Sequence, residues 1–136
     1  VGKKILIVNI GLSGTQVNQM AELERLYQLL KDSNFVIVAF PSNDFSKEPK
    51  TDQQVSDWCN SIGIHFMVAT NSHVSGRNAS SIYQWLTQKS QNGMLETEIK
   101  ADFLKFLINK QGKLVGIYSS KLSPTNNILV QAIRNN

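Results

Sequence analysis

The sequence predicts an α/β domain in which helices cover both faces of a mixed sheet. Two near-continuous apolar runs, Lys4–Asn9 and Phe35–Phe40, are typical of buried strands, and an amphipathic helix at Val17–Lys31 joins them. Such a βαβ unit has parallel strands, whereas a hairpin late in the chain adds antiparallel ones. We expect one domain over residues 1–136, because no repeat or linker interrupts this pattern.

The middle of the chain predicts a second helix and a third strand. A polar loop over residues 41–50 contains two prolines, which break regular structure. Thr51 then suits the cap of a helix that runs to about Ser61, and residues 64–69 read as a strand. The apolar face of this helix is expected to carry Val55, Trp58 and Cys59.

The last part of the chain predicts a third helix and a hairpin. The helix starts at residues 76–78, with Asn78 as its cap, and a polar, flexible stretch follows over residues 87–93. Strands at residues 102–108 and 113–118 flank a turn in which Gly112 suits the positive-φ position.

Ser123 and Pro124 are typical of a helix cap followed by a first-turn proline, and they predict a closing helix that runs to about Arg134. The inward positions of the last two helices are expected to be Ile82, Trp85, Leu86, Ile128, Leu129 and Ile133.

Composition and cysteine content exclude several classes of site. The longest apolar run, residues 35–40, is far short of the roughly 20 residues that a membrane helix needs, so we expect a soluble protein. Its compartment stays open between cytoplasmic and exported, because Val1 in place of Met implies that an upstream segment was removed. The single cysteine, Cys59, excludes an internal disulfide, and His65 and His73 lack acidic or Cys neighbours at ligand spacing. We therefore expect no metal and no cofactor.

The positive charge is concentrated in the C-terminal third of the chain. From Lys100 onward there are six basic residues and one acid, Asp102, within a net charge of +4. Such a bias attracts anionic partners, but the lysines are spaced singly, without clustered arginines or stacking aromatics. We therefore expect a solvated basic face and no nucleic acid, and a surface binder of nucleic acid or anionic membrane is a third-ranked hypothesis.

The first turn of the chain is the strongest candidate for a binding site. It connects the first strand to the first helix, where unpaired backbone N–H groups and the helix dipole favour an anion. No Walker lysine or three-glycine dinucleotide fingerprint is present. The anion-binding turn would comprise Gly11, Ser13, Gly14 and Thr15.

Five segments resemble one known family in order and spacing, nearly from end to end. They are LIVNI before the first turn, FVIVAFPSNDF with EPKT after it, HVSGRNASSIYQWL, IKADFLKFLINKQGKLVGIYSS, and the SP that opens the last helix. The chain resembles the glutathione peroxidases, a branch of the thioredoxin-like superfamily. The resemblance implies a thioredoxin-like fold and thiol- or selenol-based peroxide reduction, although the family's usual β-hairpin ahead of the first strand is absent here.

The resemblance implies a nucleophile at the start of the first helix, flanked by Gln, Trp and Asn. All four positions differ in this chain. The nucleophile falls on Gly14, or on Ser13 with a one-residue shift, and the Gln position is Asp44. The Trp-Asn pair is replaced by Ala101 and Asp102. Glycine and serine supply no thiolate, and the two carboxylates are acceptors where the family has donors. Asp44 and Asp102 also suggest a paired carboxylate site that shares a proton or holds a cation.

Two functions remain open on this basis. The leading hypothesis is a protein of this family that has lost peroxide reduction, a pseudoenzyme, and binds a protein or a small anionic ligand. The alternative is an atypical peroxidase, active in oxidative stress, that uses Cys59 with glutathione or thioredoxin as the reducing partner. The resemblance places Cys59 at the position of a resolving cysteine, yet its helix face and the neighbouring Trp58 favour a packing role.

Overall fold

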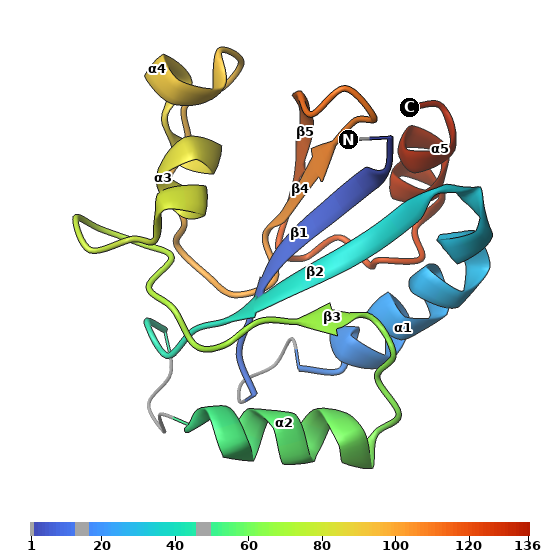
Figure 1. Ribbon diagram of the computed structural model, residues 1–136, viewed down its shortest axis with the longest axis vertical. Helices are drawn as coiled ribbons and strands as arrows, with labels where there is room; N and C mark the ends of the chain where they lie inside the picture. The colour runs from blue at the N-terminus through green and yellow to red at the C-terminus, as the bar shows by residue number, and fades with distance from the viewer. Residues whose placement is uncertain (1, 13–16, 46–49) are drawn as a thin grey trace.

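The computed structural model describes residues 2–12, 17–45 and 50–136, and its centre is a mixed five-stranded sheet in the order β3-β2-β1-β4-β5 (Figure 1). The parallel part joins β1 to β2 and β2 to β3, and the antiparallel part joins β1 to β4 and β4 to β5. The α/β fold expected from the sequence is therefore confirmed. The strands are β1 (Lys4–Ile10), β2 (Phe35–Pro41), β3 (Met67–Val68), β4 (Lys105–Ile108) and β5 (Leu114–Tyr118).

Helices pack on both faces of this sheet, as Figure 1 shows. Residues of β1 alternate between two hydrophobic clusters: Leu6 and Val8 lie in one with residues of α1, α2 and α5, and Ile7 lies in the other with residues of α3. The helices are α1 (Gln19–Leu30), the 3-10 turn η1 (Lys31–Ser33), α2 (Asp52–Ser61), α3 (Ser81–Thr87), α4 (Lys89–Asn92) and α5 (Asn127–Arg134).

The prediction for α2 is confirmed in detail. The Thr51 side chain accepts a hydrogen bond from the Gln54 backbone N–H at 3.1 Å, and Gln54 Oε1 accepts one from the Thr51 N–H at 2.8 Å. This reciprocal pair is a capping box, which satisfies two backbone donors that the first turn leaves free. Val55 and Cys59 are buried on the inward face, with Trp58 partly buried beside them.

Three predicted strand or helix starts are wrong, each for a local reason. The strand predicted over residues 64–69 is shortened to β3, because only two of its residues pair with β2. The helix predicted from residues 76–78 begins at Ser81, and Asn78 does not cap it, since residues 76–79 form a turn closed by a hydrogen bond from Ala79 N–H to Gly76 O. The strand predicted from residue 102 begins at Lys105, because Phe103 adopts a φ of 67° that no strand accommodates.

Two predictions near the other helices also need correction. Residues 87–93, expected to be a flexible stretch, contain α4, whose Asn92 side chain donates to the carbonyl oxygen of Trp85 at 2.7 Å. The closing helix α5 begins after Asn126, whose side chain accepts from Ile128 N–H at 2.9 Å, and not at Pro124. Ile128 is 66% exposed, whereas Leu129 and Ile133 are buried as expected.

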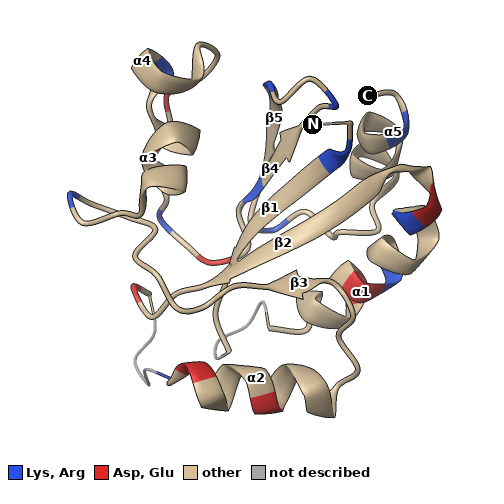
Figure 2. Ribbon diagram, viewed as in Figure 1, with Lys and Arg blue, Asp and Glu red and all other residues tan. Residues whose placement is uncertain are grey.

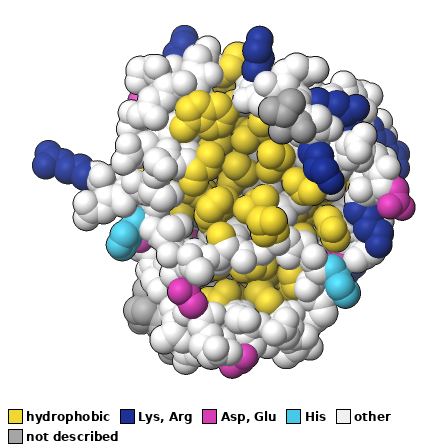
Figure 3. Space-filling view, in the orientation of Figure 1, with side chains coloured by type: hydrophobic (Ala, Val, Ile, Leu, Met, Phe, Trp, Pro, Cys, Tyr) yellow, Lys and Arg dark blue, Asp and Glu magenta, His cyan; other side chains and the backbone are white. Residues whose placement is uncertain are grey.

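The surface combines a largely apolar sheet face with separated charges. Figure 3 shows hydrophobic side chains gathered over the middle of this view, and Met67 on the edge strand β3 is 65% exposed. In Figure 2, α2 carries acidic segments only, and basic segments lie along β1, α5 and the β4-β5 end. Among the described residues, no helix combines the length and apolar character required to cross a bilayer.

Candidate functional site

The first candidate site lies where β1 and β2 end. Gly11 follows β1 directly, and the Asp102 carboxylate lies against it: a Cβ built on Gly11 would be 2.9 Å from Asp102 Cγ. Only a glycine leaves room for this approach. Ser13, Gly14 and Thr15 lie outside the described residues, so the anion-binding turn stays a prediction. The carboxylate beside Gly11 nevertheless opposes a second anion there.

Asp44 is held by a histidine and two backbone amides. His73 Nδ1 lies 2.8 Å from Oδ1, and the N–H groups of Val74 and Ser75 donate to Oδ2 at 2.8 and 3.1 Å. Burial alone would raise the pKa of Asp44, but these hydrogen bonds outweigh it and lower the pKa. The other histidine also has an acidic partner in the folded chain, because His65 Nδ1 lies 2.9 Å from Glu24 Oε2. These partners are 29 and 41 residues away, so spacing in the sequence did not reveal them.

Asp102 has the opposite environment. Burial, followed by the negative charge of Asp44, raises the pKa of Asp102 to about 6. Its Oδ1 is buried and has no hydrogen-bond partner among the described residues. The charge of Asp44 thus acts on Asp102, as the paired-site hypothesis requires. Asp44, however, is bound by His73 and two backbone amides, whereas Asp102 Oδ1 has no partner among the described residues. Within the described part of the chain, no cluster of three or more His, Cys, Asp or Glu could hold a metal. Ala101 is exposed, and its carbonyl accepts from Asn9 Nδ2 at 2.9 Å.

We expect Asp102→Asn to stabilise the protein at pH 8. A raised pKa means that the folded state binds the proton more tightly, so the favourable contribution exists at low pH and is lost as pH rises through about 6. After discounting for the partial exposure of Asp102, the gain at pH 8 should be about 1–2 kcal/mol and should fall to about a third of that near pH 4.5. Urea unfolding in choline chloride at both pH values measures it. Glu98→Gln, at a carboxylate that is 74% exposed, is the matched control. An unchanged or lower stability of Asp102→Asn at pH 8 would contradict this expectation.

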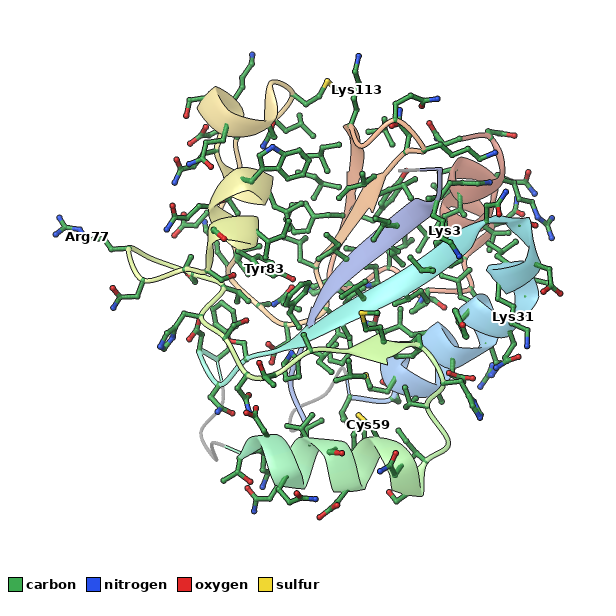
Figure 4. All side chains as sticks on the ribbon, in the orientation of Figure 1. Lys3, Lys31, Cys59, Arg77, Tyr83 and Lys113 are labelled. Carbon is green, nitrogen blue, oxygen red and sulfur yellow. The ribbon has the colours of Figure 1, made fainter. Side chains whose placement is uncertain are left out.

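Cys59 belongs to a separate site on α2. Its side chain points from α2 toward the sheet (Figure 4) and is 5% exposed, and burial raises the pKa of its thiol. Cys59 lines a cavity of about 420 Å³ between α2 and the chain around β3, together with Val55, Ile64, Phe66 and Val68. The cavity lining also includes exposed polar residues, among them Asp52 and Asn60. The only sulfhydryl of the chain therefore adjoins a space large enough for a small substrate.

Two residues near the first site were not anticipated from the sequence. Asn9 and Tyr83 are fully buried, and each keeps one polar atom without a hydrogen-bond partner among the described residues. Tyr83 packs edge-on against Phe40 and Phe106, with ring centroids 5.5 and 6.2 Å apart. An asparagine at the end of a buried strand is the one sequence signal that could have revealed part of this cluster.

Comparison with known proteins gives a consistent result. The glutathione peroxidase family model matches residues 1–87. The chain is 37% identical over 126 residues to glutathione peroxidase-like peroxiredoxin 2 of Saccharomyces cerevisiae. The aligned region covers 91% of this chain and 78% of the yeast protein. The chain is 34% identical over 122 residues to the glutathione peroxidase homolog BsaA of Halalkalibacterium halodurans, with 88% and 77% covered.

Solved structures agree with these similarities. A crystal structure of Trgpx in its apo form superposes on this chain with a TM-score of 0.72 at 31% sequence identity. The superposed region covers 98% of this chain and 82% of the Trgpx chain. A thioredoxin-family thiol:disulfide interchange protein of Chlorobium tepidum superposes with a TM-score of 0.69, covering 97% and 80%. At 14% identity this second likeness concerns the fold alone.

Proposed function

Because the chain belongs to the glutathione peroxidase family, we propose that it reduces hydroperoxides through the thiol of Cys59, with an external thiol as reductant. Related proteins named as peroxidases and peroxiredoxins support this choice over a member without activity. The observation that carries it is the position of the chain's one cysteine on a cavity of about 420 Å³. Thiol chemistry in this chain has no other residue to use, because Cys59 is its single cysteine.

The proposed reaction is a peroxide reduction followed by two thiol exchanges. The Cys59 thiolate attacks one peroxide oxygen, so that an S–O bond forms and the O–O bond breaks. The leaving alkoxide takes a proton and becomes an alcohol, or water when the substrate is hydrogen peroxide. Glutathione or thioredoxin then converts the sulfenic acid to a mixed disulfide with release of water, and a second thiol regenerates Cys59 and leaves as the disulfide.

The environment of Cys59 predicts slow turnover that rises with pH. The thiolate is the nucleophile, and burial raises the pKa of this thiol, so only a small fraction is ionised at neutral pH. The exposed polar residues of the cavity lining give a peroxide access, and the apolar residues Val55 and Phe66 favour a substrate with an apolar part.

The burial of Cys59 also favours a second candidate, a binding module without peroxidase activity. Because Cys59 is only 5% exposed, the α2 region must open before a bulky reductant can reach its sulfur. The positions that the family uses for hydrogen-bond donors are Asp44, Ala101 and Asp102 here, and they supply no side-chain N–H group.

We expect Cys59→Ser to reduce turnover to the uncatalysed background, at least 10-fold below the wild type at pH 8.5. The assay follows consumption of hydrogen peroxide and an organic hydroperoxide with glutathione or thioredoxin as reductant between pH 6.5 and 9. Ser56→Ala, a neighbour on the same cavity, should keep the activity. Undiminished turnover in Cys59→Ser would show that this thiol is not the nucleophile. A wild type without activity would favour the second candidate, a binding module.

A further inference from the structure

Three buried oxygen atoms without protein partners belong to residues around the carboxyl end of β1. They are Asn9 Oδ1, the Tyr83 hydroxyl and Asp102 Oδ1, and none accepts or donates a hydrogen bond within the described part of the chain. Asn9 and Tyr83 are 0% exposed, so bulk water does not solvate these atoms. Buried polar atoms normally have a partner, because leaving one without any costs free energy. Three such atoms on neighbouring residues point to a ligand.

Asn9 fixes the position of Asp102. Its backbone oxygen accepts from Phe103 N–H, and its side-chain Nδ2 donates to the Ala101 carbonyl at 2.9 Å, so it contacts the residues on both sides of Asp102. Rotating the amide by 180° would set Oδ1 against the Ala101 oxygen, and the observed orientation is therefore fixed. Asn9 Oδ1 belongs to the same amide group, and so it lies close to residues 101–103 as well.

The Tyr83 ring packs against Phe40, which is the β2 residue paired with Asn9 of β1, so Tyr83 lies close to Asn9. Figure 4 labels Tyr83 on α3, and its ring is held between Phe40 of β2 and Phe106 of β4. Burial, followed by the negative charge of Asp102, raises the pKa of the Tyr83 hydroxyl, which agrees with this placement. The cluster thus draws on β1, α3 and the segment before β4.

The cluster has an uncompensated negative charge. Among the described residues Asp102 forms no ion pair, and the histidine nearest to this end of the sheet, His73, is bound to Asp44. Lys105 lies close in sequence, but its Nζ donates to the backbone oxygens of Phe103, Ser119 and Ser120. The cluster therefore offers a carboxylate, an amide oxygen and a hydroxyl oxygen, and no described basic side chain binds it.

We propose that Asn9, Tyr83 and Asp102 bind a hard, oxygen-coordinated cation at the carboxyl end of β1. Carboxylate, amide and hydroxyl oxygens are the ligands that sodium, potassium, magnesium and calcium accept, whereas zinc and copper prefer sulfur and nitrogen. The cation neutralises Asp102 and satisfies all three oxygen atoms in one step. This site is independent of Cys59, which lines the separate cavity on α2.

Thermal unfolding in the presence of each cation tests the proposal. The purified chain is heated at pH 8 in sodium, potassium, magnesium or calcium chloride, with choline chloride at the same ionic strength as the reference. We expect at least one cation to raise the midpoint by roughly 3 °C or more above choline. The rise should disappear in Asp102→Asn, shrink in Tyr83→Phe and persist in Glu98→Gln.

The same measurement at pH 4.5 separates binding at Asp102 from a general salt effect. Protons then occupy the carboxyl group, so the cation-dependent rise should be lost in the wild type. The proposal is overturned when no cation exceeds choline, when Asp102→Asn responds as strongly as the wild type, or when the rise is equal at both pH values.

Discussion

Replacing Lys105 by methionine is expected to lower the free energy of unfolding by about 3 kcal/mol at pH 7. Lys105 is 0% exposed, and its Nζ donates to the backbone oxygens of Phe103 at 2.9 Å, Ser119 at 3.2 Å and Ser120 at 3.4 Å. Methionine has nearly the same length and fills the same space, but it leaves these carbonyl oxygens without their donor. The lost stability therefore reports the hydrogen bonds of the ammonium group in excess of its desolvation cost, with little contribution from packing.

The pH dependence of this loss gives a second, independent readout. Burial lowers the pKa of Lys105 to about 8, although the negative charge of Glu22 acts in the opposite direction. In the unfolded chain Lys105 keeps its proton up to its ordinary pKa of 10.5. The free energy of unfolding therefore rises as pH increases from about 8 toward that value. The Lys105→Met variant lacks this increase.

Urea unfolding of the wild type and Lys105→Met at pH 7 and pH 9.5 measures both effects. Lys113→Met, at an exposed position on the other side of the β4-β5 turn, should change stability by no more than about 0.5 kcal/mol. Equal stabilities of the wild type and Lys105→Met at pH 7 would show that the three carbonyl contacts only offset the cost of burying the charged ammonium group.

The fold was largely predictable because its strongest signals are local. The apolar runs of β1 and β2 and the Thr51 cap of α2 each act through neighbours in the sequence, and all three lie where they were expected. The start of β4 was not predictable in this way. Phe103 adopts its positive φ because its N–H donates to the Asn9 oxygen across the sheet, which is a contact between distant residues.

The candidate sites were predictable only in part. The family resemblance selected Asp44, Asp102 and Cys59; in the structure the charge of Asp44 raises the pKa of Asp102, and Cys59 lies on α2. It could not reveal that His73 binds Asp44, because their pairing depends on how the loops after β2 and β3 meet. Asn9 and Tyr83 were missed for the same reason, since polar groups in a core become informative only when their partners are known.

The largest loss of stability is expected from Tyr83→Ala, at about 3–5 kcal/mol, and almost none from Tyr83→Phe. Tyr83 is the centre of the cluster formed with Phe40 and Phe106, so truncation removes both edge-on ring contacts and leaves a cavity. Phenylalanine keeps the ring and removes only the hydroxyl, which has no partner among the described residues.

Unfolding in choline chloride isolates this effect from cation binding, because the proposed ligand is then absent. Ile82→Ala is the matched control from the same helix, since the sequence predicted an inward Ile82, whereas the structure leaves it partly buried and buries Tyr83 completely. We expect this control to lose less than half of what Tyr83→Ala loses. A loss in Tyr83→Phe as large as that in Tyr83→Ala would mean that the hydroxyl, and not the ring, stabilises this face of the sheet. The buried oxygen would then already have a protein partner, and the cation site would lose one of its three ligands.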